Sequence, residues 1–79
     1  MPAAKVERMK QRIRENVARN LLRLREEAGL SQRQLSERAD VSQTYISQIE
    51  TGQSRNFGVD LLAALAVALD KTPIDLISD

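Results

Sequence analysis

The sequence predicts an all-α protein with five helices. Apolar residues recur at steps of three and four along most of the chain, and no segment shows the strict alternation of a strand. The two prolines stand at positions 2 and 73, so none interrupts a helix between them. A chain of 79 residues forms one domain with one small core, and such a core often gains stability by dimerisation.

The first helix is expected to end at Ala28, because Gly29 can adopt the positive φ of a residue that follows a helix. One apolar stripe predicts the helix, and it consists of Val6, Met9, Ile13, Val17, Leu21, Leu24 and Ala28. The part up to about Gln11 is expected either to fray or to pack on a partner.

The second helix is expected over Gln32 to Arg38. Ser31 is its N-cap, and Gln34, three residues later, completes the pattern of a capping box. Leu35 and Ala39 are predicted to face the core.

The third helix is expected from about Gln43 to Glu50, after a tight turn at Ala39-Asp40-Val41. Ser42 caps it and Gly52 stops it. Its buried stripe consists of Ile46 and Ile49.

The fourth helix is nearly all apolar, which predicts a place at the centre of the core. Its apolar positions are Val59, Leu62, Leu65, Ala66 and Leu69. A fifth helix starts at Thr72-Pro73, with Thr72 as N-cap, proline at the first helical position and Asp75 in the first turn. Leu76 and Ile77 are expected to close the core or to serve a partner.

Composition excludes several classes of function. The chain has no cysteine and no histidine, which removes disulfides, thiolate or imidazole nucleophiles and the usual zinc sites. There is also no glycine-rich phosphate loop, so we expect no enzyme, no metal and no cofactor. No apolar run approaches the roughly 20 residues of a membrane span, and the N-terminus has no signal-peptide segment. We therefore expect a cytoplasmic protein.

Charge is distributed unevenly along the chain, although the net charge is only +1. Residues 1–28 hold eight Lys or Arg and four acids, whereas residues 57–79 hold one Lys and four Asp. This contrast between a basic N-terminal part and an acidic C-terminal part says more about possible binding partners than the net charge does.

The second and third helices, joined by a short turn, have the layout of a helix-turn-helix. The outward residues of the third helix are the uncharged Gln43, Thr44, Ser47 and Gln48. Amides and hydroxyls can distinguish base pairs by their donor and acceptor pattern, whereas a row of Lys would mainly add affinity for any duplex.

The stretch L-S-Q-R-Q-L-S-E-R-A-D-V-S-Q-T-Y-I-S-Q-I-E-T-G, residues 30–52, resembles the helix-turn-helix of the phage Cro/C1 repressor (Xre) family. The likeness covers about residues 13–77, and its one departure in the turn is Asp40, where the family usually has Gly. The resemblance implies a five-helix, lambda-repressor-like DNA-binding domain over residues 13–79, preceded by a basic extension of the first helix over residues 1–12. Restriction–modification controller proteins are among the family members of this size.

The resemblance also implies roles for particular residues. Those expected to contact base edges are Gln43, Thr44, Ser47 and Gln48. Those expected to contact the DNA backbone are Gln32, Tyr45, Thr51, Gln53 and Arg55, with Ser31 and Arg33 as further candidates. Arg25 and Glu50 match a structural pair that ties the third helix to the first. For Tyr45 a place in the core, and for Gln32 a purely structural capping role, are the alternatives.

The expected function is sequence-specific binding of double-stranded DNA by a homodimeric transcriptional regulator, with residues 43–50 in the major groove of a pseudo-palindromic operator. Phe57, Ile74 and Ile77 are the expected dimer interface. The alternative is that the basic extension dimerises or holds flanking phosphate, through Lys5, Arg8, Lys10, Arg12 and Arg14. The alternative function is a protein-interaction module, antitoxin-like or an adaptor, that keeps the fold without reading DNA. No membrane and no small-molecule ligand is expected as a partner.

Overall fold

The computed structural model describes residues 2–54 and 57–79, and every regular element in these two ranges is a helix. The helices are α1 (Ala3–Glu27), α2 (Gln32–Ala39), α3 (Gln43–Glu50), α4 (Val59–Ala68) and α5 (Pro73–Ile77). The expected all-α fold with five helices is confirmed, and α3 has the bounds that the sequence predicts.

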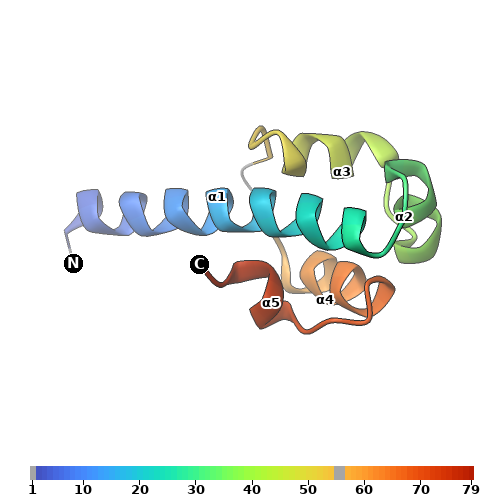
Figure 1. Cartoon of the computed structure of the whole chain (residues 1–79). Helices are drawn as coiled ribbons and strands as arrows, with labels where there is room; N and C mark the ends of the chain where they lie inside the picture. Colours follow the sequence, from blue (N-terminus) through green and yellow to red (C-terminus); the bar gives the residue numbers. More distant parts are fainter. Residues whose placement is uncertain (1, 55–56) are drawn as a thin grey trace.

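The arrangement centres on α1, which packs against both α3 and α5. These two helices lie on opposite sides of α1 in Figure 1, while its N-terminal half projects beyond the rest of the molecule. Helix α2 packs on α3 and α4, and α4 packs on α5, so the small domain closes around the C-terminal half of α1.

The helix ends follow the local signals in the sequence. The Ser31 hydroxyl accepts a hydrogen bond from Gln34 N at 3.0 Å, and the Gln34 side chain accepts one from Ser31 N at 2.8 Å, which makes a complete capping box. Thr72 and Asp75 form a second capping box at α5. The hydrogen bond that the Thr72 backbone N–H donates to the Asp75 carboxylate, followed by the one that the Thr72 hydroxyl donates to it, lowers the pKa of this carboxyl.

The core draws side chains from all five helices. Its buried apolar residues are Val17, Leu21, Leu24, Leu30, Leu35, Ala39, Ile46, Ile49, Leu65, Ala66, Leu69 and Leu76. None of the helices in the described ranges is both long and apolar enough to cross a bilayer.

One expectation about the core is wrong. Val59 is 82% exposed, because α4 is apolar around most of its circumference and only one side of it can face the core. Of the α1 stripe, Val17, Leu21 and Leu24 are buried, whereas Ala28 is exposed and Met9 and Ile13 are 57% and 37% exposed. The N-terminal half of α1, which carries Met9 and Ile13, projects beyond most of the domain (Figure 1).

Candidate nucleic-acid interface

The turn between α2 and α3 is set by Asp40, which takes the left-handed conformation at φ 55° and ψ 44°. Asp adopts this region more readily than most residues with a Cβ. The amide of the next residue, Val41 N, donates to Ser36 O at 3.1 Å, which closes the end of α2. The turn therefore forms with Asp where Gly is usual, and it directs the chain into α3.

Helix α3 is fixed to the domain along one side. Ile46 and Ile49 have no exposed surface, and Tyr45 packs half-buried against the core. At the N-terminus the Ser42 hydroxyl accepts a hydrogen bond from Tyr45 N at 3.0 Å. Burial and capping together hold the opposite side of α3 in a defined orientation.

That opposite side carries the four residues expected to meet base edges. Gln43, Thr44 and Gln48 are exposed, and Ser47 is half-buried. Together with Gln32 and Gln53 they line one shallow groove of about 390 Å³. The groove is lined entirely by uncharged polar residues, each able to donate or accept a hydrogen bond.

A buried ion pair holds the C-terminal end of α3. Arg25 Nε donates to Glu50 Oε2 at 2.7 Å and its Nη2 to Glu50 Oε1 at 3.0 Å, while Nη1 donates to Leu30 O at 2.9 Å. The two side chains are only 12% and 5% exposed. These hydrogen bonds with Glu50 raise the pKa of the Arg25 guanidinium. Glu50 is thereby neutralised inside the domain and is not presented to the groove.

Gln32 joins this network from the start of α2. Its Nε2 donates to Glu50 Oε1 at 3.0 Å, so it braces α3. The same side chain lines the polar groove. One amide N–H is used on Glu50, and the amide has a second N–H and an oxygen to offer.

The other residues expected at the DNA backbone come from the start of α2 and from the segment that follows α3. Ser31 is in the capping box, and the exposed Arg33 donates to Glu37 Oε1 at 3.1 Å. The Thr51 hydroxyl donates to Ser47 O at 2.9 Å, so its proton is engaged within the helix. Gln53 N donates to Gln48 O at 2.8 Å, which folds the loop back onto the end of α3. Arg55 lies outside the described residues.

Comparison with known proteins supports the same assignment. The family model for the helix-turn-helix matches residues 21–77, which is more than half of the chain. The chain belongs to the helix-turn-helix family. Within this family it is related to the Cro/C1-type (Xre) regulators. The prediction that the second and third helices form the helix-turn-helix is confirmed.

Three solved structures share this helix-turn-helix fold. The hypothetical transcription factor NHTF from Neisseria is 26% identical, with 87% of this chain and 78% of that chain covered and a TM-score of 0.80. The clp gene regulator ClgR from Corynebacterium glutamicum is 31% identical over 81% of this chain and 67% of that one, with a TM-score of 0.74. The restriction–modification controller protein C.AhdI from Aeromonas hydrophila is 33% identical over 80% and 94%, also with a TM-score of 0.74. No curated protein sequence matches the chain.

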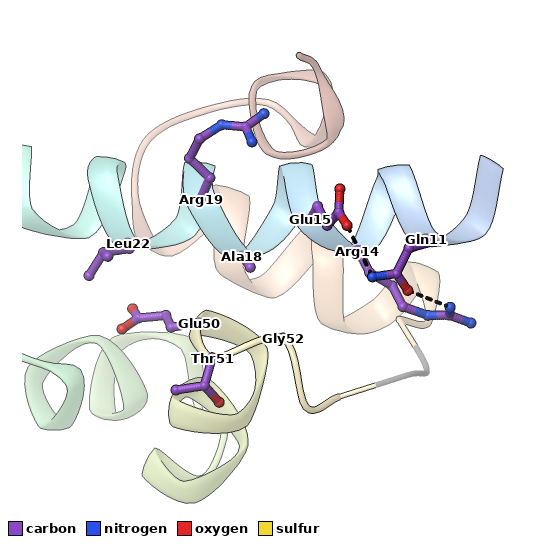
Figure 2. Close-up of a pocket in the computed structure, with 9 residues that line it drawn as sticks. All are labelled: Gln11, Arg14, Glu15, Ala18, Arg19, Leu22, Glu50, Thr51 and Gly52. Atoms are coloured by element: carbon purple, nitrogen blue, oxygen red, sulfur yellow. Dashed lines mark hydrogen bonds between the residues drawn. The ribbon is translucent and has the colours of Figure 1, made fainter. Parts of the chain in front are cut away.

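The helix-turn-helix domain has a second groove between α1 and the end of α3, of about 540 Å³ (Figure 2). Figure 2 shows Gln11 between Glu15 and Arg14: its Nε2 donates to Glu15 Oε1 at 3.1 Å, and its Oε1 accepts from Arg14 Nη1 at 3.4 Å. The groove borders Thr51 and Gly52. Acidic as well as basic side chains line this groove. We therefore expect it to bind an anion less strongly than its arginines alone would.

Two asparagines of the helix-turn-helix domain have a role that the sequence analysis missed. Asn16 Nδ2 donates to Ile77 O at 3.1 Å and to Asp79 Oδ1 at 2.8 Å. Asn20 Nδ2 donates to Leu76 O at 2.9 Å and to Ser78 O at 2.7 Å. We call Asn16 and Asn20 the asparagine clasp, since they hold the carbonyls at the end of α5. The signal in the sequence was two amides one turn apart beside the buried stripe of α1.

The three residues expected to form a dimer interface do not all lie together. Ile74 is 67% and Ile77 37% exposed, and both line a groove against α1 with Met9 and Ile13. Phe57 instead packs half-buried against the core and is not part of that groove.

Proposed function

We propose that the chain is a sequence-specific transcriptional regulator that binds double-stranded DNA as a homodimer, with α3 in the major groove. The observation that carries the proposal is the uncharged polar groove on a rigidly anchored α3. A groove of B-DNA about 12 Å wide admits an α-helix, and amides there can bond bidentately to adenine. The similarity to a hypothetical transcription factor from Neisseria and to the clp gene regulator from Corynebacterium glutamicum supports it as well.

The roles of the side chains divide into two groups under this proposal. Gln43, Thr44, Ser47 and Gln48 select the sequence through base edges. Gln32, Tyr45, Thr51, Gln53, Arg55, Ser31 and Arg33 hold the duplex backbone. Phosphate contacts fix the register of the protein on DNA and base contacts specify the sequence.

Several further points belong to the same proposal. The chain works by binding and not as an enzyme, and it acts in the cytoplasm. Its basic extension, residues 1–12, is distinct from the DNA-reading domain, residues 13–79. Two-fold pairing would give two recognition helices for a pseudo-palindromic operator, with half-sites about 34 Å apart.

The first experiment measures binding to a random duplex over a range of salt concentrations. We expect affinity to fall steeply with salt, since Lys and Arg that neutralise phosphates release counterions. An absence of binding at low salt would overturn the proposal and favour the protein-interaction module. Selection of bound duplexes from a random pool then gives the preferred sequence.

The second experiment compares two kinds of variant on the selected duplex. Gln43→Ala or Gln48→Ala should cost about 1–3 kcal/mol at the affected base pair and leave affinity for random duplex nearly unchanged. Arg33→Ala should instead weaken binding to all sequences alike. Identical behaviour of the two kinds would contradict the division into base and backbone contacts.

A further inference from the structure

The polar groove of α3 carries four side chains whose hydrogen-bonding groups are unused in the folded chain. Within residues 2–54 and 57–79 these four side chains take part in no hydrogen bond and no ion pair. They are Gln43, Thr44, Ser47 and Gln48. By contrast, the Gln34 amide is engaged in the capping box of α2, and the Gln32 amide donates to Glu50. The four side chains therefore keep their full capacity to bond a ligand.

No charged side chain among the described residues lines this groove. Glu50, at the end of the same helix, is 5% exposed and has both carboxylate oxygens bonded to Arg25. Arg33, near the start of α2, donates from Nε to Glu37. The described part of the groove thus offers a ligand amides and hydroxyls, and neither a carboxylate nor a cation.

This combination of groups discriminates between base pairs in the major groove. Guanine presents two acceptors, N7 and O6, which Arg or Lys binds bidentately, and cytosine presents an amino donor to Asp or Glu. Adenine presents one acceptor, N7, and one donor, the N6 amino group, and the amide of Gln matches both. Thymine adds a methyl group, which the methyl of Thr can contact. An uncharged array of Gln, Thr and Ser therefore matches A·T pairs.

Gln43 and Gln48 are spaced to read two separate base pairs. They are five residues apart in α3, which is about 7.5 Å along the helix axis. Successive base pairs are about 3.4 Å apart, so this rise covers about two base-pair steps. Thr44 is four residues before Gln48, and Ser47 is four residues after Gln43, so each Gln has a hydroxyl neighbour on its own face.

We propose that α3 selects A·T pairs at two positions of each half-site, one read by Gln43 and one by Gln48. In each contact the Gln Nε2 donates to adenine N7, and the Gln Oε1 accepts from the adenine N6 amino group. The Thr44 methyl contacts the methyl of a thymine beside the position of Gln48. This inference rests on the proposed function, because it needs α3 in the major groove, and it adds which base pairs the helix selects.

The first test selects bound duplexes from a random pool with the wild type, Gln43→Ala, Gln48→Ala and Gln53→Ala. We expect the wild type to enrich A·T at two positions per half-site, and each of the first two variants to lose one of them. Gln53→Ala is the matched control, since its amide lines the same groove but follows α3. It should weaken binding to all sequences and keep both preferences. Enrichment of G·C at both positions, or loss of the same preferences in Gln53→Ala, would overturn the inference.

The second test changes the DNA, so that no result depends on the folding of a variant. One selected adenine is replaced by 7-deazaadenine, which lacks the N7 acceptor and keeps Watson–Crick pairing. We expect the wild type to bind this duplex about fivefold more weakly or worse. The variant that lacks the Gln for that position should lose nothing further. Full affinity of the wild type would overturn the bidentate contact.

The thymine contact is tested in the same way. Uracil in place of the selected thymine removes only the methyl group, and we expect a smaller loss of wild-type affinity. Thr44→Ser removes the protein methyl and keeps the hydroxyl, so this variant should bind the thymine and uracil duplexes equally. A wild type that binds both duplexes equally would overturn the role of Thr44.

A gain of specificity provides the sharpest test of each Gln. Gln43→Arg and Gln48→Arg should each change the preferred pair at one position from A·T to G·C, because Arg bonds to guanine O6 and N7. An unchanged preference for A·T in both variants would overturn the assignment of these residues.

The outcomes distinguish this inference from the proposed function. A wild type that selects a defined duplex with G·C at the two positions keeps the proposed function and overturns the selection of A·T. A wild type that binds no duplex at low salt overturns the proposed function, and the inference with it.

Discussion

Helix α3 and the N-terminal arm of α1, residues 3–15, are both helical and both present side chains to solvent. Helix α3 is anchored by buried side chains, whereas the arm is joined to the domain through exposed groups, as where Arg12 bonds to Asp79. Ile46 and Ile49 anchor α3 in the core, Ser42 caps its start, and Glu50 ties its end to Arg25. The arm has no buried residue and no side-chain cap. A surface that discriminates by hydrogen-bond geometry requires fixed side chains, whereas apolar pairing or general attraction by charge requires much less order.

The largest expected effect comes from breaking the ion pair behind α3. Glu50→Ala leaves the Arg25 guanidinium buried without its carboxylate, and we expect the free energy of unfolding to fall by about 3–5 kcal/mol. The control is Glu27→Ala, which removes an exposed pair with Arg23 and should cost less than about 1 kcal/mol. Urea denaturation measures both. Equal costs would mean that the pair contributes no more than one at the surface.

The next effect tests whether the two helices differ in their anchoring. Ile49→Ala removes a fully buried side chain and should lower the free energy of unfolding by about 2–5 kcal/mol. Met9→Ala, measured at concentrations where the chain is monomeric, should change it by about 0.5 kcal/mol or less, because Met9 is 57% exposed. A large cost at Met9 in the monomer would show that the arm packs within its own molecule.

A smaller effect concerns the turn that orients α3. Asp40→Gly removes the steric cost of a Cβ at positive φ, and we expect a gain in stability of up to about 1 kcal/mol, reduced by the greater backbone freedom of unfolded Gly. Asp40→Ala keeps the Cβ and should be destabilising. Thermal unfolding of the two variants and the wild type measures these changes in stability. An Asp40→Gly variant less stable than the wild type would show that the Asp40 side chain itself contributes to the turn.

The smallest expected effect is a loss of stability at α5 when the pH is lowered. The hydrogen bond from Arg12, with that from Asn16, lowers the pKa of the Asp79 carboxyl, and Thr72 lowers that of Asp75. A lowered folded-state pKa means that each contribution is complete above the ordinary value of about 3.9 and is lost as pH falls through the lowered value. We therefore expect α5 to loosen below about pH 4 while the apolar contacts of α3 persist.

Carboxyl chemical shifts of Asp75 and Asp79 followed by NMR over a pH titration would check this. Titration of Asp75 and Asp79 at ordinary values would contradict the prediction.

Much of the fold could be predicted because the deciding signals are local. Ser31, Ser42 and Thr72 cap their helices, and Gly29 and Gly52 follow helix ends at φ 73° and 78°. The exposure of Val59 could not be predicted, since an almost wholly apolar helix gives no periodic indication of which side faces the core.

The candidate site was predictable to a similar extent. The outward face of α3 follows from helical periodicity, and the structure brings its four residues together with Gln32 and Gln53 in one groove. The asparagine clasp could not be found in this way, because its acceptors are backbone carbonyls 56 to 61 residues away along the chain. The stripe of the arm predicts a helix, but periodicity cannot say what covers it.

The clasp has a consequence for the order in which the domain folds. Contacts between α2 and α3 join neighbours in sequence, whereas Asn20 meets Leu76 across 56 positions. Closing so long a loop costs more chain entropy, and its reward comes only after the intervening helices are in place. We therefore expect the clasp to form late in folding. Loss of Asn20 should then speed unfolding much more than it slows refolding, so that the clasp determines how long a folded molecule lasts and not how quickly it forms.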